Sequence, residues 1–306
     1  MNEEPLVAVN ILSYNRKDEL RNTLTKVYAQ DYKNIEVIVV DNASNDGSPK
    51  MVTEEFPEVK LIIMDKNIGI AGWNEGFKVA RGEYILVLDD DSYPEISTIT
   101  KAIARLKVEP VSIIAFNIIN TRTSKSETEG FSNHNPYQFT GCGALLKKTM
   151  LDEIGYFDNN YFIYYNEIDL CIRAYNAGFN ILYIDDVIVY HNQSSISRRN
   201  ANQDPYISRF RYHHYFIGQY IFLIKHFRLN YFFLYTTKWI LNRLLICFKY
   251  PSYLISFLSA IIKLVLSTPG LLRSRRTVSL QLQKYYNNGK IPLVDRWYFP
   301  NFLRER

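Results

Sequence analysis

The sequence predicts an α/β fold with a mostly parallel central sheet, followed by a helical C-terminal region. Short apolar runs alternate with amphipathic segments, as is typical of parallel strands joined by right-handed helical crossovers. The run at 84–88 is apolar at every position and too short for a helix, so it indicates a strand that is buried on both faces. Strands are expected at residues 6–12, 35–40, 59–64 and 84–88, with helices at 17–30 and 70–80.

Polar side chains follow these runs at the points where the strands end. The carboxyl ends of parallel strands meet at one edge of a sheet, and ligands of open α/β sheets bind there. The residues expected at this edge are Ser13, Asn15, Asp41, Asn42, Asn67, Asp89, Asp90 and Asp91.

Three consecutive aspartates, Asp89–Asp91, follow the run at 84–88. Carboxylates this close together repel one another and resist desolvation, and a divalent cation among them removes both problems. The triplet therefore indicates a metal that holds a diphosphate. The alternative is a solvated acidic turn that caps the next helix, since Ser92 and Pro94 follow.

Seven motifs in order resemble the nucleotide-sugar-binding half of the family 2 (GT-A fold) glycosyltransferases, over about residues 5–195. The nearest resemblance is to the branch of rhamnosyl- and galactofuranosyltransferases. The motifs are Asp41–Ser48, Asn67-x-Gly69 with Asn74-x-Gly76, Asp89–Asp91, Thr140–Leu146, Ile154–Asp158, Tyr164–Arg173 and Val189–His191.

The resemblance implies a divalent cation, Mn²⁺ or Mg²⁺, held by Asp89 and Asp91, with Asp91 as the direct ligand. Asp90 would face the opposite side, toward the ribose or the acceptor. His191 would complete the metal shell, and imidazole suits manganese better than magnesium. The alternative for His191 is a structural histidine that hydrogen-bonds a loop.

The implied donor is a UDP- or dTDP-linked sugar. Asp41 would contact its base or ribose with Ser13 and Asn15 alongside, although turn capping also explains Ser13 and Asn15. Asn67 and Gly69 would shape a loop near the diphosphate. The full set expected on the nucleotide is Ser13, Asn15, Asp41, Asn42, Asn67, Gly69, Asp89 and Asp90.

The segment 166–169 offers two carboxylates for the general base, Glu167 and Asp169. The family's usual form is Glu-Asp-x-Asp with the second residue as base, whereas this chain has Asn166 first and Glu167 second. The base is therefore Glu167 or Asp169, and position favours Glu167. One or both acids could instead only stabilise the first turn of a helix. A single base without a carboxylate nucleophile implies inversion at the anomeric carbon.

Charge divides the chain in two. From Ser197 to Arg306 there are 18 Lys and Arg against 3 Asp and Glu, while the first 196 residues hold 18 against 28. The basic part contains aromatic, apolar stretches at 212–227, 231–248 and 253–272. Such helices suit the interface of an anionic membrane. The last stretch approaches the ~20 residues of a span, but its central Lys263 favours an interfacial position.

Other classes of protein are disfavoured. No Gly-x-Gly-x-x-Gly follows the first strand, and no Walker loop, zinc spacing or disulfide framework is present. No RNA-binding motif accompanies the basic region, so nucleic acid is not expected. The acidic start lacks a signal peptide, which indicates the cytoplasm.

The sequence thus predicts a catalytic domain at 1–200 and a membrane-associating or homo-oligomer-forming region at 201–306. We expect sugar transfer to a glycan or polyprenyl-linked acceptor on the inner face of the cell membrane. The alternatives are a nucleotidyltransferase and a non-catalytic carbohydrate-binding or scaffold protein on the same fold.

Overall fold

The computed structural model describes residues 4–131, 134, 136–192 and 209–287. These residues fall into two compact units. We call the part drawn from 4–159 and 173–192 the sheet unit, and the part drawn from 160–172 and 209–287 the helical unit. The expected domain boundary at residue 200 lies outside the described residues and stays a prediction.

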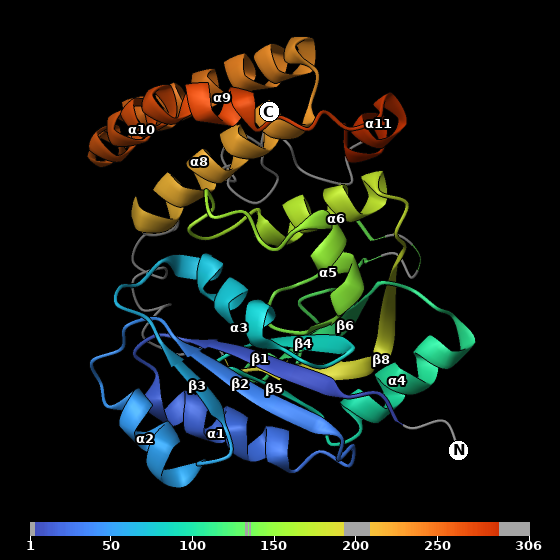
Figure 1. Ribbon diagram of the computed structural model, residues 1–306. Helices are drawn as coiled ribbons and strands as arrows, with labels where there is room; N and C mark the ends of the chain where they lie inside the picture. The colour runs from blue at the N-terminus through green and yellow to red at the C-terminus, as the bar shows by residue number, and fades with distance from the viewer. Residues whose placement is uncertain (1–3, 132–133, 135, 193–208, 288–306) are drawn as a thin grey trace. The chain divides into compact units, whose positions relative to one another are not determined.

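The sheet unit is built on one eight-stranded sheet in the order β3-β2-β1-β4-β7-β6-β8-β5 (Figure 1). The pairs β1–β2, β1–β4, β2–β3 and β6–β8 are parallel, and the other three are antiparallel. The predicted α/β fold with a mostly parallel sheet is confirmed. The strands are β1 (Val7–Ser13), β2 (Ile35–Asp41), β3 (Lys60–Ile63), β4 (Tyr84–Asp89), β5 (Ser92–Pro94), β6 (Ile113–Asn120), β7 (Ala144–Lys147) and β8 (Ile181–His191).

Helices cover both faces of the sheet (Figure 1). On one face, Val9 of β1 belongs to the same apolar cluster as Leu24 of α1 and Ile99 of α4. On the other face, Asn10 donates a hydrogen bond of 3.0 Å to the carbonyl of Trp73, at the start of α3. The helices of this unit are α1 (Lys17–Tyr28), α2 (Ser48–Glu55), α3 (Trp73–Val79, after the 3₁₀ turn Gly69–Gly72), α4 (Thr98–Val108) and α5 (Lys148–Ile154).

Strand register brings the polar strand ends together. Ser13 lies opposite Asp41 in the β1–β2 pair, and Leu12 lies opposite Asp89 in the β1–β4 pair. The short strand β5 turns back after the aspartates and pairs with β8, with Ser92 opposite His191. The predicted polar edge therefore exists, and the β5–β8 pair adds a histidine to it.

The helical unit consists of long helices whose aromatic side chains interlock. In its core the rings of Phe216 and Trp239 stack with centroids 3.7 Å apart, and Phe257 meets Phe216 edge-on. These residues come from three helices, which confirms the predicted helical C-terminal region. The helices are α8 (Arg209–His226), α9 (Leu229–Lys249), α10 (Leu254–Arg273, after the 3₁₀ turn Pro251–Tyr253) and α11 (Leu280–Asn287). Helix α6 (Asn166–Asn176) begins in this unit and ends in the sheet unit.

Candidate active site

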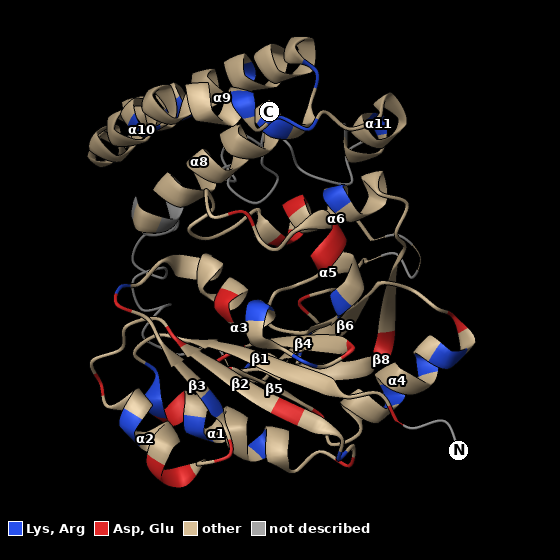
Figure 2. Ribbon diagram, viewed as in Figure 1, with Lys and Arg blue, Asp and Glu red and all other residues tan. Residues whose placement is uncertain are grey.

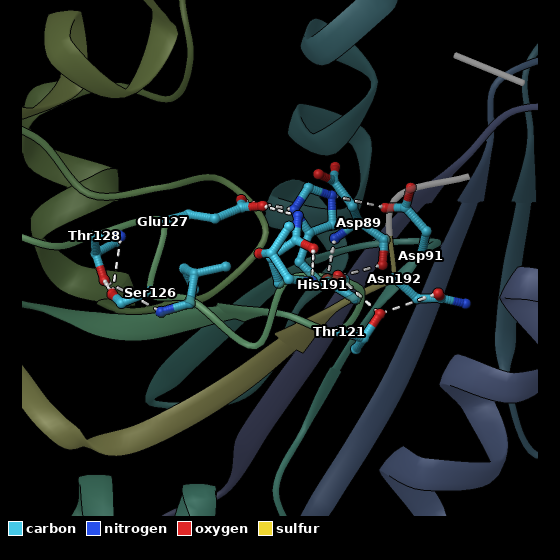
Figure 3. Close-up of polar contacts among 12 residues, drawn as sticks. Asp89, Asp91, Thr121, Ser126, Glu127, Thr128, His191 and Asn192 are labelled. Atoms are coloured by element: carbon cyan, nitrogen blue, oxygen red, sulfur yellow. Dashed lines mark hydrogen bonds and ion pairs between the residues drawn. The ribbon is translucent and has the colours of Figure 1, made fainter. Parts of the chain in front are cut away.

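Three side chains of types that can ligate a metal meet at the carboxyl edge of the sheet (Figure 3). Asp89 is the last residue of β4, Asp91 lies in the turn after that strand, and His191 is the last residue of β8. The His191 Nε2 atom lies 3.5 Å from Asp91 Oδ1. Backbone pairing holds this approach, because Asn192 N donates to the Asp91 carbonyl at 2.8 Å. The structure thus brings together the three residues predicted as metal ligands.

Cys142 joins this cluster. One ligand atom each from Asp89, Cys142 and His191 lie within 4.8 Å of one another, and the cysteine is buried. A tight turn sets its position, with Gly143 N donating to the Thr140 carbonyl at 3.0 Å. No sequence signal indicated this thiol, because a single cysteine among small residues also fits an ordinary core.

Arg16 supplies a positive charge to the aspartates, a role that the sequence analysis missed. Its Nη1 lies 3.0 Å from Asp90 Oδ1 and 2.5 Å from Asp91 Oδ2. The other oxygen of Asp90 accepts a hydrogen bond of 3.0 Å from Tyr14 N. Asp90 therefore fastens the loop after β1 to the aspartate turn, and its expected contact with the nucleotide stays a prediction.

The pKa values report how strongly these charges interact. Burial and the charge of Asp91 raise the pKa of Asp89 to about 7, and burial raises the pKa of Asp90 to about 7 despite Arg16. Burial also acts to raise the pKa of Asp91, but His191 and Arg16 outweigh it and leave this pKa below its usual value. Burial acts to lower the pKa of His191, yet its contacts with Asp91 and Glu127 raise it to about 10.

Asp41 is the buried carboxylate at the end of β2. Its Oδ2 accepts a hydrogen bond of 2.8 Å from Ser44 N, and its Oδ1 is buried with no hydrogen-bond partner in the part of the chain that the structure describes. Ser13 lies opposite Asp41 in the sheet and is likewise buried. A buried acceptor without a partner is costly, so this end of the strand is suited to a ligand that donates a hydrogen bond.

Asn42, Asn67 and Gly69 close a loop on one another. Asn42 Nδ2 donates to both Asn67 Oδ1 and the Gly69 carbonyl at 3.0 Å. Gly69 has φ +67°, a backbone conformation that favours glycine. These contacts give the three residues a loop-shaping role, while the expected position of the loop beside the diphosphate stays a prediction.

Asn15 links the first two loops of this edge. Asn15 N donates to Ser44 Oγ at 2.9 Å, and Asn15 Oδ1 accepts from Asn45 N at 2.8 Å. Asn15 itself has φ +53°, which asparagine tolerates better than most residues. The turn-capping interpretation therefore accounts for Asn15, while its contact with the nucleotide stays a prediction.

The two candidate bases lie in different environments within the helical unit. Asp169 is fully buried and contacts His226 Nε2 at 2.6 Å and the Tyr161 hydroxyl at 3.2 Å. Glu167 is half-buried. The backbone before it is strained, because Tyr164 and Tyr165 have φ values of +67° and +65°. The structure encloses Asp169 in protein and leaves Glu167 partly open to solvent.

The family model described as glycosyl transferase family 2 matches residues 8–183, more than half of the chain. The chain belongs to this family. Among its curated relatives is glycosyltransferase AglE of Haloferax volcanii, which is 24% identical over 204 residues, 61% of this chain and 67% of AglE. Another is WfaP of Escherichia coli, named UDP-Glc:alpha-D-GlcNAc-diphosphoundecaprenol beta-1,3-glucosyltransferase. It is 34% identical over 109 residues, 35% of this chain and 43% of WfaP. The matches therefore span from under half to about two thirds of these relatives.

Solved structures share the fold. The mannosyltransferase PcManGT from Pyrobaculum calidifontis, in complex with GDP-Man and Mn²⁺, has a TM-score of 0.56 at 18% identity, over 97% of this chain and 83% of PcManGT. S. aureus TarS 1-349 in complex with UDP-GlcNAc has a TM-score of 0.57 at 18% identity, over 71% of this chain and 65% of that one. The GT-A fold of family 2 is thereby confirmed, and the rhamnosyl- and galactofuranosyltransferase branch stays a prediction.

Proposed function

We propose that this protein is a metal-dependent, inverting glycosyltransferase that moves a sugar from a UDP- or dTDP-linked donor to a lipid-linked or cell-surface glycan. One observation carries the proposal: in a chain of family 2, Asp89, Asp91 and His191 converge at the carboxyl edge of the sheet.

The donor atoms of this cluster fit a divalent cation. Asp91 Oδ1 is buried and accepts no hydrogen bond from any described residue, and 3.5 Å to His191 Nε2 is too long for a good one. Asp89, Asp91 and His191 would hold the ion, and imidazole favours Mn²⁺ over Mg²⁺. A bound divalent cation stabilises the negative charge of a departing nucleoside diphosphate.

The nucleotide would bind along the ends of β1 and β2. The buried acceptor at Asp41 Oδ1, which has no partner among the described residues, suits an N–H of the base or a ribose hydroxyl. The loop closed by Asn42, Asn67 and Gly69 would lie beside the diphosphate.

Glu167 is the proposed general base. It would accept the proton of the acceptor hydroxyl while that oxygen attacks the anomeric carbon and the nucleoside diphosphate leaves from the opposite side. Asp169 is less suited, because His226 and Tyr161 already hold one of its oxygens in a sealed position. A single displacement of this kind inverts the anomeric configuration.

The helical unit would dock on the cytoplasmic face of the cell membrane. Residues 209–287 contain no Asp or Glu (Figure 2). Large apolar side chains are exposed on α10, among them Ile255 (75%), Ile262 (61%) and Leu266 (75%). Among the described helices, Pro251–Arg273 alone is long and apolar enough to cross a membrane. The exposed Lys263 favours a position in the membrane interface.

The name of WfaP specifies an acceptor linked to diphosphoundecaprenol, and we propose the same class of acceptor here.

The proposal is tested by incubating the purified protein with UDP-, dTDP- and GDP-linked sugars and a polyprenyl diphosphate glycan, with Mn²⁺ or with EDTA. Release of nucleoside diphosphate together with a lengthened, inverted glycan is expected only with metal. Full transfer in EDTA would remove the metal from the proposal. Release of pyrophosphate from a nucleoside triphosphate and a sugar phosphate would instead establish a nucleotidyltransferase.

A further inference from the structure

Glu127 lies directly behind the metal-site histidine (Figure 3). Its Oε2 is 2.9 Å from His191 Nδ1, the ring nitrogen that does not approach Asp91. We infer that Glu127 is a positioning residue, which holds His191 with the lone pair of Nε2 presented to the metal. The inference rests on the proposed metal site.

A hairpin after β6 brings Glu127 to this place. Ile119 pairs with Ser126 across it, and Glu127 N donates to the Ile118 carbonyl at 2.7 Å. The histidine side is fixed as well, because Thr121 N donates to the His191 carbonyl at 3.1 Å. The backbone of both Glu127 and His191 is thus held by hydrogen bonds to neighbouring segments.

The hydrogen bonds around Asn120 determine which atom donates in the contact between Glu127 and His191. Asn120 Oδ1 accepts from the backbone N–H groups of Arg122 and Thr123, at 3.0 and 3.1 Å. Its Nδ2 must therefore face Glu127, and it donates to Oε1 at 2.6 Å. Glu127 Oε2 remains to accept from His191.

A carboxylate can only accept in this arrangement, so His191 Nδ1 carries the hydrogen. In the neutral ring, Nε2 then presents the lone pair that a metal requires. Carboxylates that hold a ligating histidine in this way commonly contribute 10- to 100-fold to metal affinity.

The variant Glu127→Gln separates this role from simple packing. Glutamine has one acceptor and one donor end, and Asn120 and His191 both present donors to it. One contact must fail, or the histidine must place its hydrogen on Nε2, where it blocks the metal. The matched control is Glu129→Gln, because Glu129 lies in the same segment and its side chain is exposed.

The measurement is Mn²⁺ affinity of the full chain without nucleotide, from the electron paramagnetic resonance signal of free Mn²⁺. We expect Glu127→Gln to weaken binding about 10- to 100-fold, with Glu129→Gln at the wild-type value and both melting temperatures unchanged. Equal affinity of Glu127→Gln and the wild type would overturn the inference. If the wild-type chain binds no Mn²⁺, the proposed metal dependence fails instead.

A second variant tests the polarity itself and covers the case in which Glu127→Gln folds poorly. In the double variant Asn120→Asp/Glu127→Gln, the glutamine amide can donate to the carboxylate introduced at position 120 while its oxygen accepts from His191. That carboxylate can still accept from the two backbone N–H groups. Recovery of most of the lost Mn²⁺ affinity is expected. A double variant that binds Mn²⁺ as weakly as a folded Glu127→Gln, or that leaves an unfolded one unrescued, would contradict the inference.

Discussion

In each unit of this protein the described residues include a close aspartate–histidine pair, and the two pairs differ in what surrounds them. In the sheet unit, Asp91 and His191 stand 3.5 Å apart, with a buried Asp91 oxygen that accepts no hydrogen bond from the described residues. In the helical unit, Asp169 and His226 are 2.6 Å apart, with side chains 0% and 1% exposed. The first pair leaves Asp91 Oδ1 able to ligate a cation, whereas in the second pair His226 Nε2 and the Tyr161 hydroxyl both contact Asp169 Oδ1. The same two residue types therefore form a candidate metal site in one unit and a buried structural contact in the other.

The largest effect is expected from breaking the pair of the sheet unit. Asp91→Ala should abolish sugar transfer and its dependence on divalent cations, because the proposed direct metal ligand is lost. The fold should survive, since one member of a repelling carboxylate group is also removed. Transfer assays with and without EDTA check this. The control Asp186→Ala removes an exposed aspartate from the same strand as His191 and should keep full activity.

The next comparison separates the two carboxylates of α6. Glu167→Gln should lower turnover about 10²- to 10⁴-fold, the usual contribution of a general base, while donor binding and thermal stability persist. Asp169→Asn should show itself first in stability, because Asp169 is enclosed by His226 and Tyr161. Turnover and melting temperature are measured for both variants. An active Glu167→Gln beside a stable but inactive Asp169→Asn would transfer the role of base to Asp169.

The two histidines should respond in opposite ways. His226→Ala removes the imidazole that contacts the buried Asp169 carboxylate and should cost about 1–3 kcal/mol of unfolding free energy, with Mn²⁺ affinity unchanged. His191→Ala should weaken Mn²⁺ binding while the protein melts near the wild-type temperature. Denaturant unfolding gives the unfolding free energy of each variant, and Mn²⁺ titration gives its metal affinity. Loss of metal affinity in His226→Ala would show that the two pairs do not act separately.

The smallest effect concerns two isoleucines of nearly equal exposure, Ile262 on α10 (61%) and Ile96 in the sheet unit (62%). Ile262→Glu should weaken affinity for anionic vesicles at least about tenfold, since burial of one such side chain contributes about 1.5–3 kcal/mol and each 1.4 kcal/mol is about tenfold. Ile96→Glu should have no effect on flotation. High salt should weaken binding of the wild type without abolishing it, because the apolar contribution persists. A wild-type protein that ignores the vesicles and forms a stable oligomer would make the helical unit an assembly element.

The strands and their polar ends could be predicted because both follow from local pattern. The run at 84–88 ends in Asp89 as expected, and Ser13 and Asp41 lie in register at the same edge. His191 was assigned to the candidate metal site by resemblance to the family. In the structure, the pairing of β5 with β8 brings His191 to this edge. Strand β5 has only three residues, which is too short to leave a pattern in the sequence.

Arg16, Glu127 and His226 could not be predicted for a related reason. Each reaches its partner across 57 to 75 residues of chain, through loop geometry or helix packing that no periodicity encodes. Because Asn166 departs from the family's Glu-Asp-x-Asp form, the sequence left the general base undecided between Glu167 and Asp169. The enclosure of Asp169 gives a physical reason to favour Glu167, which position alone did not.

Arg16 also bears on how the protein can be handled in the laboratory. Its guanidinium bridges Asp90 and Asp91, and His191 stands beside Asp91. These side chains offset the negative charge of the aspartate turn from within the chain. Chelator treatment should therefore give a folded protein that can be stored, crystallised and later reloaded with a chosen cation.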